Sequence, residues 1–193
     1  MESITVKSLD VKLINVENAR MAEERDAIDE WMASWVADLP LDREVEGIVE
    51  RIQFLHKRMK RMLEETLAEF DLNIGEWSVL SALWNSGEPF QSSPGYLAKR
   101  AELTTGAMTN RLDGLEAEGL VKRLPDPDDR RGVIVELTPK GRELFERSVG
   151  AQATKEQFVA SALNETERKQ LNKLLRRMVR RAEQATSAPA KIH

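Results

Sequence analysis

A helix that leads directly into a two-stranded hairpin is the feature that most constrains how this chain can fold. Apolar residues within positions 104–118 repeat at the spacing of one helix face, which predicts a helix there. Residues 119–137 follow with the sequence GLVKRLPDPDDRRGVIVEL, in which runs 121–124 and 133–137 have strand-like composition. Between these runs lie the turn-forming residues Pro125, Pro127 and Gly132. The sequence therefore predicts a short helix followed by a projecting β-ribbon.

The predicted helix has two chemically different faces. At about 100° per residue, Gly106 and Asn110 point about 160° away from Met108. The core-facing residues are Met108, Leu112 and Leu115, and the positions that flank the outward face are Thr105, Thr109 and Asp113. Small side chains allow a helix to approach base edges closely, and an Asn amide can both donate to and accept from adenine. A solvated surface helix is the alternative interpretation of this face.

The tip of the predicted hairpin carries two adjacent arginines, Arg130 and Arg131, after two aspartates. Arginines on a projecting ribbon suit the narrow minor groove or the phosphate backbone of DNA. A neighbouring aspartate can hold a guanidinium in one rotamer through paired hydrogen bonds. Charged hairpin tips are common, so this tip indicates DNA binding only because it follows a candidate DNA-reading helix.

A second, shorter helix precedes the first. Ser92-Ser93-Pro94 supplies a capping residue and a proline at the first helical position, and Thr104 starts the next helix after a tight connection. We therefore expect a helix-turn-helix followed by a wing, in a mainly α-helical fold with one small β-hairpin. Ser93 and Thr104, at the starts of the two helices, complete the predicted DNA-binding set.

The remaining helices predict a four-part organisation. We expect an N-terminal extension with dimerisation helices (1–71), a winged helix-turn-helix (72–140), C-terminal dimerisation helices (141–185) and a flexible tail (186–193). The helix predicted from about Arg43 carries a long apolar stripe suited to a partner helix.

Composition excludes several classes of function. The chain has no Cys and two His, so we expect no disulfide, no usual zinc site and no cofactor. No segment approaches the roughly 20 apolar residues of a membrane span, and no secretory signal is recognisable, which predicts a cytoplasmic protein without membrane contact. The net charge of −4 conceals 13 acidic and 5 basic residues in positions 1–50, with a basic remainder. No cluster of catalytic side chains is present, so we do not expect an enzyme.

The stretch LTTGAMTNRLDGLEAEGLVKRLPDPDDRRGVIVELTPKGRELFE resembles the multiple-antibiotic-resistance regulator (MarR) family, and the resemblance covers about residues 43–182. It implies a homodimer of winged helix-turn-helix units on palindromic double-stranded DNA. Family members are mostly repressors that a small ligand releases. The alternative is a helical protein-interaction module, which would use the long apolar stripe and the basic run from Arg168 to Arg181 without reading a DNA sequence.

A narrower resemblance concerns the ligand. The helix with Trp31 and Trp35, together with TTGAMTNR and DPDDRRG, is similar to the urate-responsive branch of the family. That branch implies ligand contacts from Trp35, or Trp31 as the alternative, and from Arg111 and Arg123. The two arginines would pair with the charge of a small anionic ligand, urate-like or an aromatic acid. Ser78 stands where the branch has an aspartate and would supply one hydrogen bond. Independently, Arg111 falls about 60° from Met108, where a partly buried cation needs an anionic partner in the protein or in a ligand.

Overall fold

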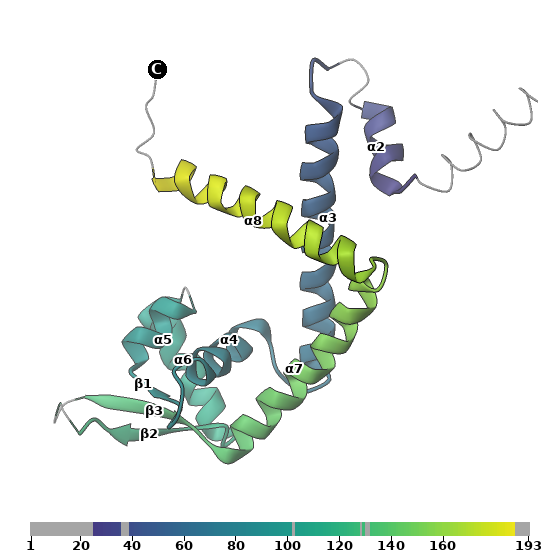
Figure 1. The fold of residues 1–193 in the computed structure, drawn as a ribbon. Coiled ribbons are helices and arrows are strands. Elements are labelled where there is room, and N and C mark those ends of the chain that lie inside the picture. The colour runs from purple at the N-terminus through teal and green to yellow at the C-terminus, as the bar shows by residue number, and fades with distance from the viewer. Residues whose placement is uncertain (1–24, 36–38, 102, 128, 130–131, 188–193) are drawn as a thin grey trace, which may run out of the picture. The chain divides into compact units, whose positions relative to one another are not determined.

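The computed structural model describes residues 25–35, 39–101, 103–127, 129 and 132–187 (Figure 1). The chain divides into two compact units, Met1–Lys60 and Arg61–His193. The elements in chain order are α2 (Ala27–Trp35), α3 (Arg43–Ala68), α4 (Ile74–Trp84), β1 (Gln91–Ser92), α5 (Pro94–Arg100), α6 (Thr105–Ala117), β2 (Val121–Pro125), β3 (Val133–Leu137), α7 (Pro139–Ala160) and α8 (Glu165–Ser187).

The second unit contains the hydrophobic core. Three antiparallel strands form its sheet in the order β1-β3-β2, so β3 is central. Arg123 of β2 lies opposite Val135 of β3, and Gln91 of β1 lies opposite Glu136. The sheet and the helices α4, α5, α6 and α7 all contribute to one buried cluster, whose largest members include Leu80, Leu83, Leu97, Met108, Leu112, Leu115 and Phe145. The predicted wing strands are confirmed, whereas β1 is an addition that the sequence did not indicate.

The predicted helix starts are set by side-chain caps. Ser93 Oγ accepts a hydrogen bond from the Tyr96 backbone N–H at 3.3 Å, and Thr104 Oγ1 accepts one from Ala107 at 3.3 Å. Thr138 Oγ1 does the same for Gly141 at 3.0 Å, at the start of α7. These caps satisfy backbone donors that a helix leaves unpaired at its first turn.

Helix α7 is fixed to the core by close backbone approach and by buried polar contacts. A Cβ atom on Gly141 would lie 2.1 Å from the Leu120 carbonyl oxygen, so this position requires glycine. Farther along α7, Ser148 Oγ accepts a hydrogen bond from Trp77 Nε1 at 3.1 Å, and Gln152 Oε1 accepts one from Thr66 Oγ1 at 3.1 Å. The base of the wing, α7, α4 and the last turns of α3 therefore form one packed body.

In the first unit, α2 packs on the first half of α3. Arg51 pairs with Asp26 at 2.8 Å and with Asp29 at 2.7 Å. Gly47 is buried beside Met32, where its missing side chain leaves room for Arg51. Throughout the described chain, every helix is too short or too polar to traverse a lipid bilayer, and no cluster of three metal-ligand side chains occurs there.

Candidate nucleic-acid interface

Helix α6 presents the two faces that its sequence predicts. Met108, Leu112 and Leu115 are each only 1% exposed and pack in the core. The opposite side carries exposed residues without charge: Thr105, Gly106, Thr109 and Asn110. Thr109 Oγ1 donates to the Thr105 carbonyl at 3.1 Å, which holds that side chain along the helix. These four residues therefore form a small, uncharged surface that is backed by the core, and the exposed Asp113 flanks it.

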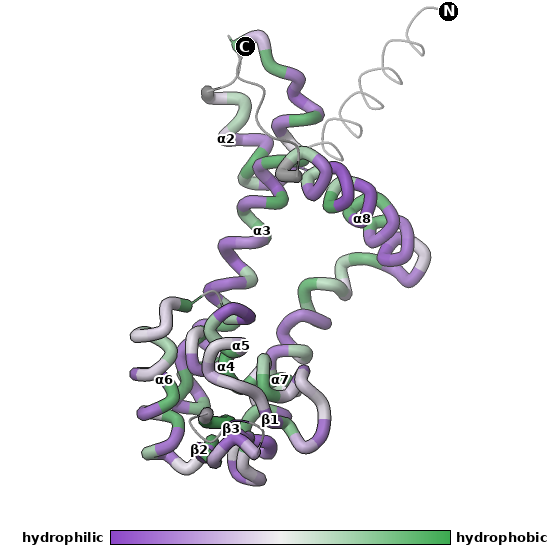
Figure 2. The backbone as a smooth tube through the Cα atoms, turned by 90° about the vertical axis from the view of Figure 1, so that its left-hand side faces the viewer, coloured by the Kyte–Doolittle hydropathy of each residue, from purple (hydrophilic) through white to green (hydrophobic). Residues whose placement is uncertain are grey.

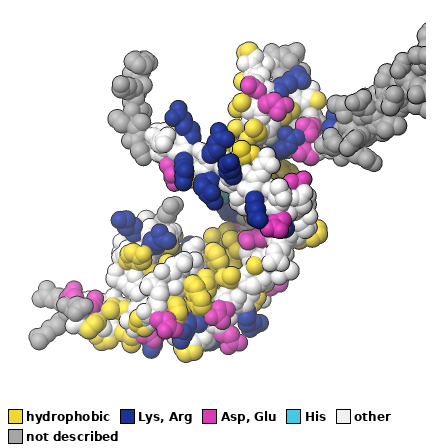
Figure 3. Space-filling view, viewed as in Figure 1, with side chains coloured by type: hydrophobic (Ala, Val, Ile, Leu, Met, Phe, Trp, Pro, Cys, Tyr) yellow, Lys and Arg dark blue, Asp and Glu magenta, His cyan; other side chains and the backbone are white. Residues whose placement is uncertain are grey.

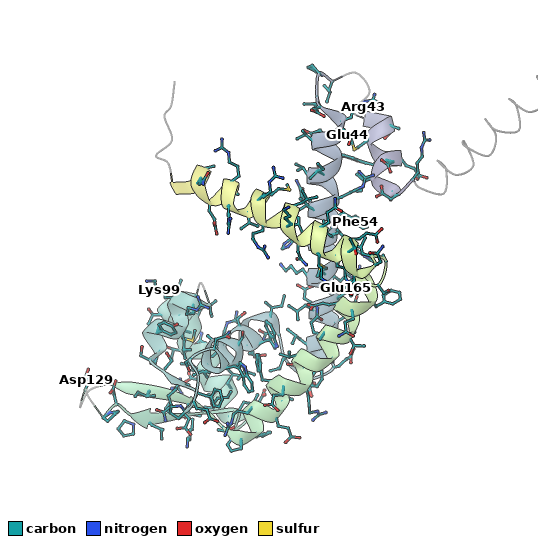
Figure 4. The ribbon with its side chains drawn as sticks, in the orientation of Figure 1. Arg43, Glu44, Phe54, Lys99, Asp129 and Glu165 are labelled. Carbon is teal, nitrogen blue, oxygen red and sulfur yellow. The ribbon has the colours of Figure 1, made fainter. Side chains whose placement is uncertain are left out.

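Helix α5 adds a polar surface to the candidate interface, beyond the residues predicted from the sequence. Tyr96 is 49% exposed, and Lys99 and Arg100 are exposed in the last turn of this short helix. Lysine and arginine side chains lie together over this part of the molecule (Figure 3), and Lys99 extends from α5 (Figure 4). The signal for this surface was the segment YLAKR, in which one aromatic and two basic residues accompany the buried Leu97 and Ala98. These side chains suit contacts with phosphates.

The hairpin closes through backbone hydrogen bonds at its tip. Asp126 N–H donates to the Gly132 carbonyl at 3.1 Å, and Gly132 N–H donates to the Asp129 carbonyl at 2.8 Å. Asp129 marks this tip in Figure 4. The predicted DNA contacts Arg130 and Arg131 lie outside the described residues, so their roles stay predictions.

One ion-pair cluster joins two residues that the sequence had assigned to different tasks. Arg123 Nη2 lies 2.6 Å from Asp113 Oδ1, and its Nη1 lies 2.5 Å from Glu116 Oε2. The backbone N–H of Arg123 also donates to Glu116 Oε1 at 2.9 Å. Partial burial lowers the pKa of Arg123, but the hydrogen bonds that its guanidinium donates to Asp113 and Glu116 outweigh this effect, and the net shift of the pKa is upward. Sequence patterning did not foresee this pairing of a predicted DNA contact with a predicted ligand contact.

Arg111 leaves α6 on the side of α4. Its Nη1 donates to Asn73 Oδ1 at 2.9 Å, whereas its Nε is buried without a hydrogen-bond partner among the described residues. A Cβ atom on Gly75 would lie 2.0 Å from Arg111 Cζ, so the guanidinium lies directly against the first turn of α4. Ser78 follows one turn later, and its hydroxyl donates to the Ile74 carbonyl at 2.7 Å.

The two tryptophans of the predicted ligand set lie on α2, in the first unit. Trp31 is 39% exposed. The side chain of Trp35 lies outside the described residues. Ser78, Arg111 and Arg123 belong to the second unit. The ligand assignment of these five residues therefore stays a prediction.

Comparison with known proteins places this arrangement in a family. The family model described as MarR family matches residues 72–133. The regulator PecS of Dickeya dadantii, an HTH-type transcriptional regulator, is 30% identical over 161 residues, which cover 83% of this chain and 95% of PecS.

Two solved structures show the same fold. A variant of MepR from Staphylococcus aureus matches with a TM-score of 0.64 at 25% identity, covering 69% of this chain and 97% of that one. A variant of MarR from Escherichia coli in complex with operator DNA matches with a TM-score of 0.56 at 28% identity, covering 72% and 99%.

The core-backed α6, its preceding turn and the hairpin define a winged helix-turn-helix protein. With the match to PecS over nearly the whole of that protein, the chain belongs to the MarR family. The predicted fold class and family are confirmed. The specific link to the urate-responsive branch stays a prediction.

Proposed function

We propose that this protein is a transcriptional regulator, most simply a repressor, that binds palindromic operator DNA as a homodimer. The carrying observation is the outward face of α6, where small, uncharged, exposed side chains are backed by three fully buried ones. This composition lets a helix enter a major groove without repelling phosphates. The solved relative in complex with operator DNA supports the proposal.

The side chains of α6, α5 and the wing have different roles in this proposal. Asn110 reads a base edge, and Gly106 allows close approach of the helix. Threonine and serine hydroxyls at the helix starts contact phosphates or bases, as do the flanking threonines: Ser93, Thr104, Thr105 and Thr109. Lys99 and Arg100 of α5 contact phosphates, and Arg130 and Arg131 extend the contact from the wing.

Exposed apolar surface on two helices supports the homodimer of this proposal, because a monomer would leave that surface in water. Helix α3 exposes one apolar face along most of its length: Val45, Ile48, Val49, Ile52, Leu55 and Met59. Helix α8 exposes a second: Leu171, Leu174, Leu175, Met178 and Val179. A second copy of the chain would cover these faces, and its two recognition helices would read half-sites about one DNA turn apart.

Release by a small anionic ligand, urate-like or an aromatic acid, is the regulatory part of the proposal. Arg111 supplies the principal positive charge, because its Nε is buried and unpartnered among the described residues. Ser78 lies one turn beyond the glycine that Arg111 covers and could accept a hydrogen bond. Arg123 already pairs with Asp113 and Glu116, so an anionic ligand would compete with two carboxylates for its guanidinium. Trp35, or Trp31, remains assigned by resemblance.

Selection of binding sites from random DNA, followed by affinity measurements at several salt concentrations, tests the DNA-binding function. We expect a palindrome, and an affinity that falls steeply with salt because phosphate contacts release counterions. Asn110→Ala should change the preferred base at one position of each half-site, whereas Arg130→Ala should weaken all sequences and reduce the salt slope by about 1.

Lys155→Ala is the matched control for the lost charge, since Lys155 of α7 pairs with Glu69, which follows α3, at 3.0 Å. It should leave both the palindrome and the salt slope unchanged. A wild-type protein that selects no sequence, or binds DNA independently of salt, would contradict the proposed function and favour a protein-interaction module.

A further inference from the structure

We propose that Arg123 is a positioning residue that fixes the wing to the recognition helix α6 and thereby sets DNA sequence preference without contacting DNA itself. This inference rests on the proposed DNA-binding function. It assigns to the cluster of Asp113, Glu116 and Arg123, hereafter the clamp, a task that differs from both tasks predicted for its members.

The clamp joins α6 and β2 through three hydrogen bonds, all donated by Arg123. Asp113 and Glu116 are three residues apart, so their carboxylates leave the same side of α6. The guanidinium of Arg123 reaches one oxygen of each, while its backbone N–H binds the other oxygen of Glu116. Two groups of Arg123 therefore bind Glu116. Together they fix where β2 lies along α6 and how far the strand is from the helix.

Each end of the clamp stands on rigid structure. Arg123 is the middle residue of β2 and lies opposite Val135, which is fully buried in the central strand. On the helix, Asp113 and Glu116 each follow a residue that is 1% exposed, Leu112 and Leu115. A change in the angle between wing and helix must therefore break the clamp, because neither end can follow the movement cheaply.

The electrostatics of the interface require the same pairing. Asp113 lies one helical turn after Asn110 and is largely exposed, so its carboxylate is on the side of α6 that approaches DNA. An unpaired carboxylate there would repel the phosphate backbone. Arg123 offsets this negative charge from within the protein, and its side chain is only 28% exposed. The guanidinium of Arg123 is thus directed at α6 rather than toward solvent.

A direct phosphate contact by Arg123 is the competing role, and the two roles predict opposite patterns. Loss of a phosphate contact weakens all sequences alike and reduces the salt slope by about 1. Loss of a clamp lets the wing and helix adopt several relative positions, so that the preference for particular bases broadens. Removal of the two carboxylates distinguishes the roles, because it breaks the clamp and leaves the arginine in place.

The experiment compares site selection, operator affinity and salt slope for Arg123→Gln and for the double variant Asp113→Asn with Glu116→Gln. We expect both to lose about fivefold or more in the ratio of operator to scrambled-site affinity, in the range of couplings between groups in contact. In both variants, the preference for particular bases should broaden at the same positions of the binding site. Only Arg123→Gln should also lose overall affinity, because it leaves two carboxylates unpaired near the phosphates, and Arg123→Lys should recover part of that loss.

Arg142→Gln is the matched control, since Arg142 pairs with Glu88 at 3.6 Å and lies over the Phe90 ring instead of contacting α6. It should preserve the selected sequence. Uniform weakening by Arg123→Gln with an unchanged preference, or an unchanged preference in the double variant, would overturn the clamp. Because the wild type must first select a sequence, these results are distinguishable from failure of the proposed function.

Discussion

At the scale of single residues, the contact between Arg111 and Gly75 shows how one missing side chain positions a cation. The guanidinium occupies space that any Cβ at position 75 would fill. Asn73 Oδ1 accepts from Arg111 and also from the backbone N–H groups of Gly75 and Glu76. A positive charge therefore lies beside a helix N-terminus, which is itself partly positive. A bound anion would relieve this repulsion and could accept from the buried Nε.

Substitution of Arg111 or Gly75 should weaken the release of operator DNA by the ligand. We expect Arg111→Gln and Gly75→Ala each to raise the concentration of urate or aromatic carboxylate that half-releases labelled operator, by about tenfold or more, since a partly buried charge pair is lost. Release is measured by fluorescence anisotropy and normalised to the operator affinity of each variant. Lys155→Ala should behave as the wild type. Normal release in both variants would exclude Arg111 from the ligand site.

Residue roles that depend on one helix were predictable, and roles that depend on hairpin placement were not. The spacing of Met108, Leu112 and Leu115 defines the buried side of α6, and Gly106 and Asn110 follow on the other side. The partners of Arg123 depend on where β2 crosses the helix, and no periodicity encodes that crossing. The sequence therefore indicated a cation near α6 but not the carboxylates that hold it.

At the scale of elements, the strand β1 was missed because it is two residues long and neither residue is apolar. Gln91 and Ser92 join the sheet through the edge of β3, and the Phe90 carbonyl accepts from the Leu137 N–H at 3.1 Å. Glu136 of β3 then connects all three strands through its side chain. One of its oxygens lies 2.6 Å from Lys122 Nζ of β2, and the other accepts from Gln91 Nε2 of β1.

This cross-strand link should make sheet stability depend on pH. The hydrogen bond from Lys122, with that from Gln91, lowers the pKa of Glu136. A depressed folded-state pKa stabilises the fold above the unfolded value of about 4.3, and this stabilisation is lost as pH falls through the folded value. We expect Glu136→Gln to reduce the free energy of unfolding at pH 7 by about 0.5–1 kcal/mol, and the difference from wild type to shrink below about pH 4.

Urea unfolding of both proteins at pH 7 and pH 3.5 measures this difference. Glu143→Gln, at an exposed position on α7, is the control for removal of one carboxylate and should show little effect at either pH. A destabilisation of Glu136→Gln that persists undiminished at the lower pH would show that shape, rather than charge, links the three strands.

At the scale of the whole molecule, the two exposed apolar faces lie on helices that also carry charge on their other sides. In α8 the basic residues recur at spacings of three and four, opposite the apolar residues: Lys169, Lys173, Arg176 and Arg180. Hydrophilic and hydrophobic positions accordingly alternate along this helix (Figure 2). The stripe on α3 was predictable from its period, because the same spacing that makes a helix amphipathic also identifies the side that needs a cover.

A charge placed on either apolar face should separate the proposed dimer, whereas a charge on the basic side of α8 should not. We expect Leu174→Glu and Leu55→Glu to sediment at the monomer mass at concentrations where the wild type sediments at twice that mass, because a dimer cannot bury an unpaired carboxylate cheaply. Lys173→Glu is the matched control, because it introduces the same side chain at the neighbouring position, on the basic side of α8. This variant should remain dimeric.

The separated variants should bind a single half-site about as tightly as the wild type does. They should lose the additional affinity for a palindrome, because that gain comes only from linking two recognition helices. If Leu174→Glu and Leu55→Glu stay dimeric and keep the full palindromic affinity, the apolar faces of α3 and α8 serve some purpose other than joining two copies of this chain.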